Sequence, residues 1–447
     1  MHVRKWKNVF LLGLVFLSFN VLLAQDKVLV EKLSLETAVQ KTLQQNAKVL
    51  LAKIETDLAN AQYKSTEAVY LPQVNLSYSA MGTNNPLNAF GFKLQQKSIV
   101  QQDFNPVLLN DPGFTGDFTT KLSLQQPLVN KDMWLMRKAV KQQTLVQQYK
   151  NIRTNEYLAY ITQQTYLQLS MAYATKDVLQ ESLKNMQLVQ KFTTDRFNQG
   201  LIQKSDWLNV GVQVKTLETN LEEMNSAIAA ASDYLNLLMN KPTGNIYLTD
   251  SLNNSIKAVN DSLSLNTQRA DFSAMQAALK SYDLMIKSTK AAYLPRVNGF
   301  AQYQLNDNRM LGFGAGSYLV GLMVQWDIFS AHQTKNKLAK QQMERKQIQT
   351  QLEANIAEAS VELRKAMRQY KDAQFQIQQR RLAVEQSGEA LRILTNRYQQ
   401  GLVNTTDVLM AQTQLSQQHL AALQATMNAQ MAAYYMQFLT GISSTLK

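Results

Sequence analysis

Apolar residues recur at helical spacing along most of the chain. Between Leu33 and Leu71 there is no Gly or Pro, and Leu35, Val39 and Leu43 repeat at intervals of four residues, which predicts one continuous helix. Two further stretches of nearly 70 residues lack Pro and almost lack Gly. At a rise of about 1.5 Å per residue they predict helices on the order of 100 Å long, which do not fold into a compact globule. The long helices are predicted at 131–199 and 332–400, and shorter ones at 204–239 and 405–439, with another between 269 and Pro295.

The apolar spacing changes from helical to alternating after Pro72 and again after Pro295. Proline disfavours the α conformation of the residue before it, so Tyr70 with Pro72 and Tyr293 with Pro295 are predicted to switch the chain from helix to strand. Such alternation fits a transmembrane strand, and it fits a half-buried soluble sheet equally well. The alternating segments predict two hairpins, the first around a long loop at 81–116 and the second at 296–327.

Two motifs occur twice in the same order. The segment KSTEAVYLPQVN at 64–75 returns as KSTKAAYLPRVN at 287–298, with nine identical positions, and RFNQGL at 196–201 returns as RYQQGL at 397–402. Such periodicity predicts two structural repeats. We place the repeats at 25–240 and 269–447, joined by a linker with a short side element at 241–268.

Each long helix is followed by a glycine. Gly200 and Gly401 are predicted to end the helices in the left-handed conformation. Ser205, and Thr405 or Thr406, are predicted to cap the helices that follow. Each repeat then reads as helix, hairpin, very long helix, tight turn and helix.

The N-terminus predicts export. Residues 1–24 carry three basic residues, then an apolar stretch, then Ala24 at a plausible cleavage point, which is typical of a signal peptide. The alternative is a membrane anchor, but its apolar stretch is shorter than the roughly 20 residues that span a bilayer. No later segment is apolar for as long, so a mature chain that crosses a membrane is expected to do so as a closed β-barrel.

Composition excludes several function classes. The absence of Cys removes disulfides, thiolate metal sites and a lipid anchor on an N-terminal Cys. The three histidines, His2, His332 and His419, are far apart, so we expect no metal site, no cofactor and no enzyme. The excess of 46 basic over 33 acidic residues is dispersed, which favours anionic lipids or anionic substrates over nucleic acid as partners. The Gly-rich segment 311–316 opens no helix and is expected to be a loop, not a dinucleotide site.

Four strands leave two open sheet edges, which lipid does not tolerate. We therefore expect the chain to oligomerise. Two copies would supply eight strands, a barrel that side chains fill, whereas three would supply twelve and leave room for a conduit. Three copies would also bring the long helices together as a closed tube.

These features resemble the TolC-like outer-membrane efflux proteins, or outer membrane factors. The resemblance rests on the duplicated Tyr-Leu-Pro switch, the duplicated Gly-Leu turn and the long helices between them. It implies an α+β membrane protein: a homotrimer with a 12-strand barrel, four strands per chain, continued by a periplasmic α-helical coiled-coil tunnel. It further implies a Gram-negative outer-membrane location and a passive exit duct for tripartite efflux or type I secretion. Its implied partners are outer-membrane lipid, a periplasmic adaptor that opens the duct, and an inner-membrane pump.

The resemblance also implies roles for the residues of the turns. Gly200 with Leu201 and Gly401 with Leu402 correspond to adaptor-docking tips. Their other interpretation is simple helix capping. Nothing else in the sequence separates the two interpretations.

The resemblance also implies a gate just beyond the turns. In the family, the residue that matches Tyr398 hydrogen-bonds to the one that matches Asp206 and so holds the tunnel closed. The residues that match Asp206 and Asp407 line the narrowest end of the tunnel. Both aspartates also suit the first turn of a helix, where the macrodipole favours carboxylates. The chain departs from the family's best-known member at two positions of this gate. Val403 replaces an Arg that contributes to closing the tunnel, and Met410 replaces an Asp that forms a second ring of carboxylates. The rival interpretation of the whole chain is a periplasmic coiled-coil scaffold without a pore.

Overall fold

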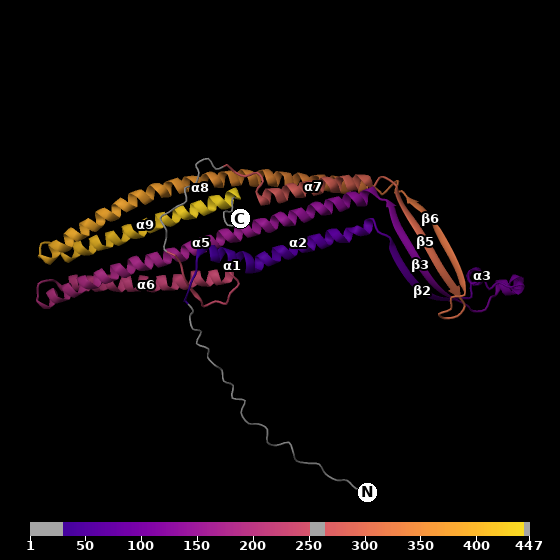
Figure 1. Ribbon diagram of the computed structural model, residues 1–447, viewed down its shortest axis with the longest axis horizontal. Coiled ribbons are helices and arrows are strands. Elements are labelled where there is room, and N and C mark those ends of the chain that lie inside the picture. The colour runs from indigo at the N-terminus through magenta and orange to yellow at the C-terminus, as the bar shows by residue number, and fades with distance from the viewer. Residues whose placement is uncertain (1–29, 251–263, 442–447) are drawn as a thin grey trace, which may run out of the picture.

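The computed structural model describes residues 30–250 and 264–441, so the predicted signal peptide at 1–24 lies outside the described residues. The described chain forms a long rod of helices with a β-sheet at one end (Figure 1). The helices of the rod are α1 (Leu35–Gln45), α2 (Ala47–Ser65), α5 (Lys131–Asn198), α6 (Lys204–Leu238), α7 (Ala270–Ala291), α8 (Gln333–Gln399) and α9 (Thr405–Thr440).

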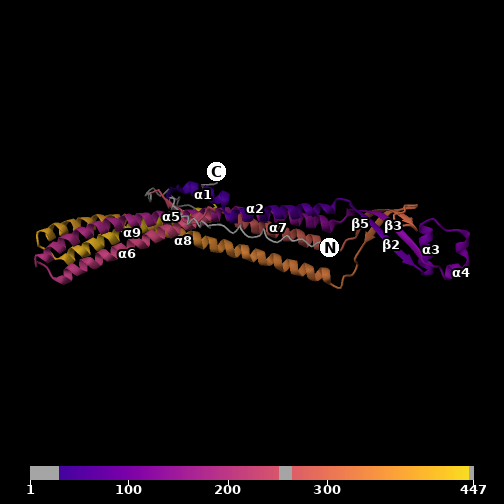
Figure 2. The same ribbon diagram turned by 90° about the horizontal axis from the view of Figure 1, so that it is seen from below.

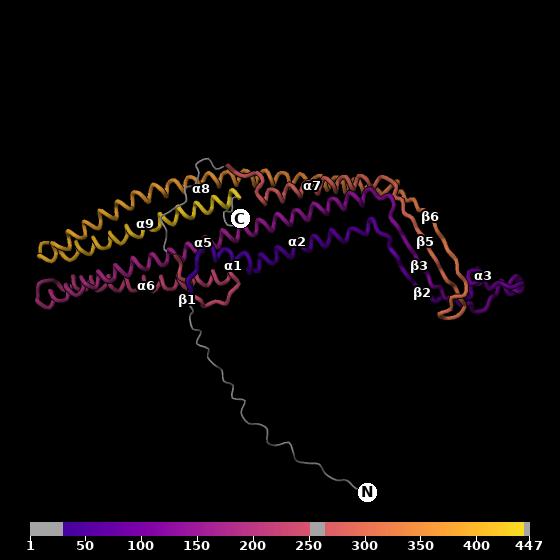
Figure 3. The backbone as a smooth tube through the Cα atoms, viewed as in Figure 1, coloured from indigo at the N-terminus to yellow at the C-terminus, as the bar shows by residue number. Residues whose placement is uncertain are grey.

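The two longest helices run from the sheet to the far end of the rod (Figure 3). Along α5 lie α1 and α2 on the sheet side and α6 on the far side; α9 lies along the far part of α8, and α7 lies between α5 and the sheet-side part of α8. Within the described residues, none of the helices combines the length and the apolar character needed to cross a membrane.

The helix predicted over 33–71 is interrupted, and that prediction is wrong at Asn46. The Asn46 backbone is extended (φ −63°, ψ 132°), its Oδ1 accepts from the Lys48 N–H at 2.8 Å, and its Nδ2 donates to the Leu238 carbonyl at 2.7 Å. Asparagine is a strong N-cap because its side chain replaces a missing helical acceptor. It therefore ends α1, starts α2 and ties both to the end of α6. A 3₁₀ turn, Thr66–Val69, closes α2 before Pro72.

The four-stranded sheet consists of β2 (Gln73–Thr83), β3 (Thr115–Val129), β5 (Arg296–Asp307) and β6 (Ala315–Gln325). The strands are antiparallel in the order β2-β3-β5-β6, so β2 and β6 are its outer strands. A small parallel pair, β1 (Val30–Lys32) with β4 (Ile246–Leu248), lies beside the middle of the rod and supplies the side element of the linker.

The loop predicted at 81–116 is largely folded, which corrects that prediction. It contains α3 (Pro86–Gln95), a 3₁₀ turn (Gln101–Phe104) and α4 (Pro106–Asn110). Both α-helices begin with an Asn-Pro pair, in which Asn85 or Asn105 caps the helix and the proline occupies its first position. Proline suits that position because its missing N–H would have no helical partner.

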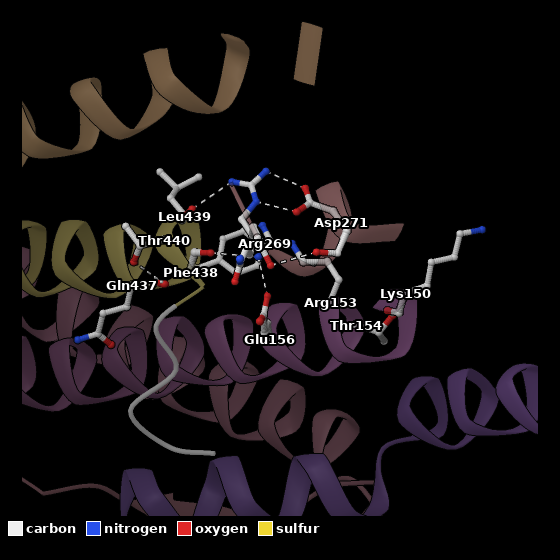
Figure 4. A network of polar contacts seen from close by, with 12 residues as sticks. Lys150, Arg153, Thr154, Glu156, Arg269, Asp271, Gln437, Phe438, Leu439 and Thr440 are labelled. Atoms are coloured by element: carbon white, nitrogen blue, oxygen red, sulfur yellow. Dashed lines mark hydrogen bonds and ion pairs between the residues drawn. The ribbon is translucent and has the colours of Figure 1, made fainter. Parts of the chain in front are cut away.

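A polar junction joins the middle of α5, the start of α7 and the end of α9 (Figure 4). Arg269 Nη1 donates to the Leu439 carbonyl at 3.1 Å, and its Nε and Nη2 donate to the two carboxylate oxygens of Asp271 at 2.7 Å each. Arg153 Nη1 donates to the Phe438 carbonyl at 3.0 Å and pairs with Glu156 at 2.8 Å. Two cations thus meet the carbonyl end of α9, where the helix dipole favours positive charge.

The charge of Asp271 depends on this junction. Burial opposes ionisation, but the hydrogen bonds from Arg269 and the charges of Arg153 and Arg269 outweigh it and lower the pKa of Asp271 below its usual range. The paired carboxylate therefore keeps Arg269 in place.

Candidate functional site

Two tight turns form the end of the rod opposite the sheet (Figure 1). Gly200 ends α5 with φ 71° and Gly401 ends α8 with φ 77°. In each turn the following leucine N–H bonds back five residues at 2.9 Å, from Leu201 to the Arg196 carbonyl and from Leu402 to the Arg397 carbonyl. The glycine N–H bonds back three residues in both cases, which completes a Schellman motif.

The two leucines of the turns point into solvent. Leu201 is 66% exposed and Leu402 is 69% exposed. The backbone hydrogen bonds of the Schellman motifs hold the turns without help from these side chains. The leucines are therefore free to contact another molecule.

The helices after the turns begin differently from the prediction. The N-caps are Gln203 for α6 and Asn404 for α9, whereas Ser205 and Thr405 lie inside the first turn. Asp407 Oδ2 accepts from the Asn404 backbone N–H at 3.1 Å in a capping box, which gives Asp407 a structural role.

Asp206 occupies the equivalent position of α6. It is half-buried, and it lies in a first turn whose macrodipole favours a carboxylate. Met410, one turn further along α9 than Asp407, is exposed.

The hydrogen bond from Tyr398 to Asp206 that the resemblance implies is not among those of the described residues. Tyr398 is only 3% exposed, and its hydroxyl lies 2.9 Å from Thr405 Oγ1 and 3.3 Å from Thr193 Oγ1. Thr193 already donates to the Val189 carbonyl, so it accepts from Tyr398, whose oxygen accepts from Thr405. Tyr398 therefore links α8 to α5 and to the start of α9.

Aromatic contacts that the motifs did not predict surround this link. The Arg196 guanidinium lies 4.9 Å from the Phe192 ring centroid and 5.1 Å from that of Tyr398. Phe197 stacks on Trp207 at 5.3 Å. Trp207 Nε1 also donates to Thr194 Oγ1, at 3.2 Å, and so braces the first turn. Trp207 was the signal in the sequence that could have predicted these contacts. At the matching position after the second turn the chain has Val408, so the tryptophan is specific to the first turn.

Replacing Tyr398 by phenylalanine is expected to loosen the second turn. The change leaves the buried Thr405 hydroxyl without its acceptor, at a cost of about 1–3 kcal/mol, whereas the Thr193 hydroxyl keeps its bond to the Val189 carbonyl. Hydrogen exchange at the amides of Gly401 and Leu402 should accelerate roughly tenfold or more. Tyr370→Phe is the matched control, because the buried Tyr370 hydroxyl has no partner within the described residues. Equal exchange in both variants would show that the hydroxyl link does not hold the turn.

No three or more His, Cys, Asp or Glu side chains within 30–250 and 264–441 are grouped so that they could hold a metal ion. The chemistry of the turns is instead that of an exposed apolar surface beside a braced helical end.

Comparisons with known proteins identify the same architecture. A model of the family described as outer membrane efflux protein matches residues 38–241 and 264–441. The cation efflux system protein CusC of Escherichia coli O157:H7 is 23% identical over 393 residues, covering 85% of this chain and 80% of that protein. A crystal structure of CusC superposes with a TM-score of 0.80 at 19% identity and covers 91% of both chains. The outer membrane protein VceC of Vibrio cholerae gives a TM-score of 0.77 at 17% identity, covering 91% of this chain and 96% of that one. The chain belongs to the outer membrane efflux protein family.

Proposed function

We propose that the chain is an outer-membrane efflux channel that acts as the passive exit duct of a tripartite efflux or type I secretion system. The observation that carries this proposal is a sheet with one polar and one apolar face, placed at one end of a rod whose length comes from helices of 68 and 67 residues. The matching relatives are efflux and outer membrane proteins, not enzymes. Energy would come from the partner pump.

The faces of the sheet differ in polarity. Ser77, Lys121 and Gln304 are paired neighbours on one face, whereas Leu76, Leu122 and Tyr303 are paired neighbours on the other. The apolar residues of the second face are exposed. An exposed apolar face beside a polar one suits strands between lipid and a water-filled lumen.

The outer strands suggest how the duct closes. β2 and β6 each have one edge without a partner strand in the sheet. In lipid such edges must pair, so β2 of one copy would join β6 of the next. Three copies would give the twelve strands that leave a conduit. Their helices would then form the periplasmic tunnel.

The turns at the far end suit a role in docking and gating. Leu201 and Leu402 offer the adaptor an apolar surface, and Asp206, Asp407 and Met410 lie within the first two turns behind it. Docking would spread the helix ends in the manner of an iris. The hydrogen bonds of Tyr398 to Thr193 and Thr405 would help to hold the closed state, because Val403 replaces the Arg that contributes to the closing lock in the family's best-known member.

The proposal is tested by the mass and conductance of the native complex. Extracted from outer membranes in mild detergent, with bound detergent subtracted, the complex should have the mass of three mature chains. In planar bilayers it should form discrete conducting steps. A monomer that is stable without detergent and forms no steps would instead support the periplasmic coiled-coil scaffold.

A further inference from the structure

The connection between β2 and β3, residues 84–114, extends beyond the end of the sheet that faces away from the rod (Figure 2). It is folded on itself. Lys93 Nζ pairs with Asp103 at 2.7 Å, and the rings of Phe90 and Phe104 meet edge to face at 5.8 Å. Such contacts hold α3 and the following 3₁₀ turn as one unit.

This β2–β3 connection is anchored on the polar face of the sheet. Gln96 Nε2 donates to Asp117 Oδ1 and to the Gly116 carbonyl, both at 2.9 Å. Asp117 shares its face with Thr119 and Asn306, because side chains alternate along a strand and these two residues are directly paired. The Asp117 side chain is completely buried. A buried carboxylate needs donors, and Gln96 is one of those that supply them.

The anchor reaches across the sheet. Gln96 Nε2 also donates to the Asp307 carbonyl at the end of β5, at 3.3 Å, and Lys97 Nζ donates to the Gly316 carbonyl of β6 at 3.0 Å. Two consecutive residues of the connection thus contact β3, β5 and β6. The connection crosses the end of the polar face instead of leaving it open.

We infer that the β2–β3 connection narrows the outer mouth of the duct and limits the size of solute that passes there. This inference rests on the proposed function, in which the polar face lines the lumen. Three copies would bring three such connections around one axis, far from the helix tips. The outer end would then select by size independently of the gate at the other end.

Thiol labelling on intact cells tests the inference without depending on the gate. The chain has no cysteine, so Ser77→Cys on the polar face introduces a single reactive site. A small charged thiol reagent added outside the cell is expected to label it. A maleimide that carries a long polyethylene glycol chain is expected to be excluded.

Two changes should remove this exclusion. Gln96→Ala with Lys97→Ala deletes the anchoring side chains and should raise labelling by the large reagent about tenfold or more. Replacing 84–114 by Asn-Gly should abolish the exclusion, because Thr83 and Thr115 are directly paired and a two-residue hairpin can join them. Gln101→Ala, an exposed change within the same connection, is the matched control and should preserve the exclusion.

The outcomes separate the inference from the function on which it rests. Equal labelling by the large and small reagents in the unaltered connection would overturn the size limit and leave the duct intact. Exclusion that survives the Asn-Gly replacement would overturn it as well. If neither reagent labels Ser77→Cys in any background, the polar face does not line a lumen open to the outside, and both proposals fail.

Discussion

Replacing Arg269 by methionine is expected to destabilise the protein by about 1–3 kcal/mol, because the change removes a buried guanidinium and the hydrogen bonds that it makes to the partly exposed carboxylate of Asp271 and to the end of α9. Arg269 is 6% exposed and makes three hydrogen bonds, two to Asp271 and one to the Leu439 carbonyl. Methionine keeps the bulk of the side chain but removes both hydrogen bonds from Arg269 to the carboxylate, which keeps only the nearby charge of Arg153 and a backbone N–H. The midpoint of denaturant unfolding, followed by helical circular dichroism, measures the loss.

Arg345→Met is the control for this prediction. Arg345 pairs with Asp283 at 2.6 Å, so the chemistry is the same, but both side chains are about a third or more exposed. Exposed pairs contribute little, and this variant should unfold near the wild-type midpoint. Equal destabilisation by the two changes would mean that burial at the junction is not what makes Arg269 important.

Features that depend on neighbouring residues were predictable from the sequence. The absence of proline and the spacing of apolar residues predicted a helix at 131–199, and α5 spans Lys131–Asn198. The glycines after the long helices predicted left-handed ends, which Gly200 and Gly401 show. Both signals act within one or two turns of helix, so they can be read without knowing the fold.

Features that depend on distant residues were not predictable in this way. Asn46 breaks a helical pattern while its Nδ2 bonds to Leu238, 192 residues away. Tyr398 takes Thr193, 205 residues away, in place of Asp206. No local pattern specifies such partners. The helices within 81–116 are a different case, because the two Asn-Pro pairs at their starts are local signals that the sequence itself contains.

Replacing both Leu201 and Leu402 by aspartate is expected to abolish export and leave assembly intact. Each side chain is about two-thirds exposed, and the turns are held by backbone hydrogen bonds, so the unbound protein loses little. An adaptor that buries a leucine here would lose about 1.5–3 kcal/mol of apolar burial at each site and would have to desolvate a charge instead. The loss recurs at every tip of an oligomer.

Growth of the native host on a panel of toxic compounds measures export, scored against a strain that lacks the protein. The double aspartate variant should be as sensitive as the deletion strain, while the mass of its extracted complex equals that of the wild type. Leu201→Met with Leu402→Met is the matched control. It keeps an apolar surface at both turns, so its resistance should equal that of the wild type. Resistance at the wild-type level in the aspartate variant would leave the turns with helix capping as their sole role, and a reduced mass would place these leucines in assembly instead of docking.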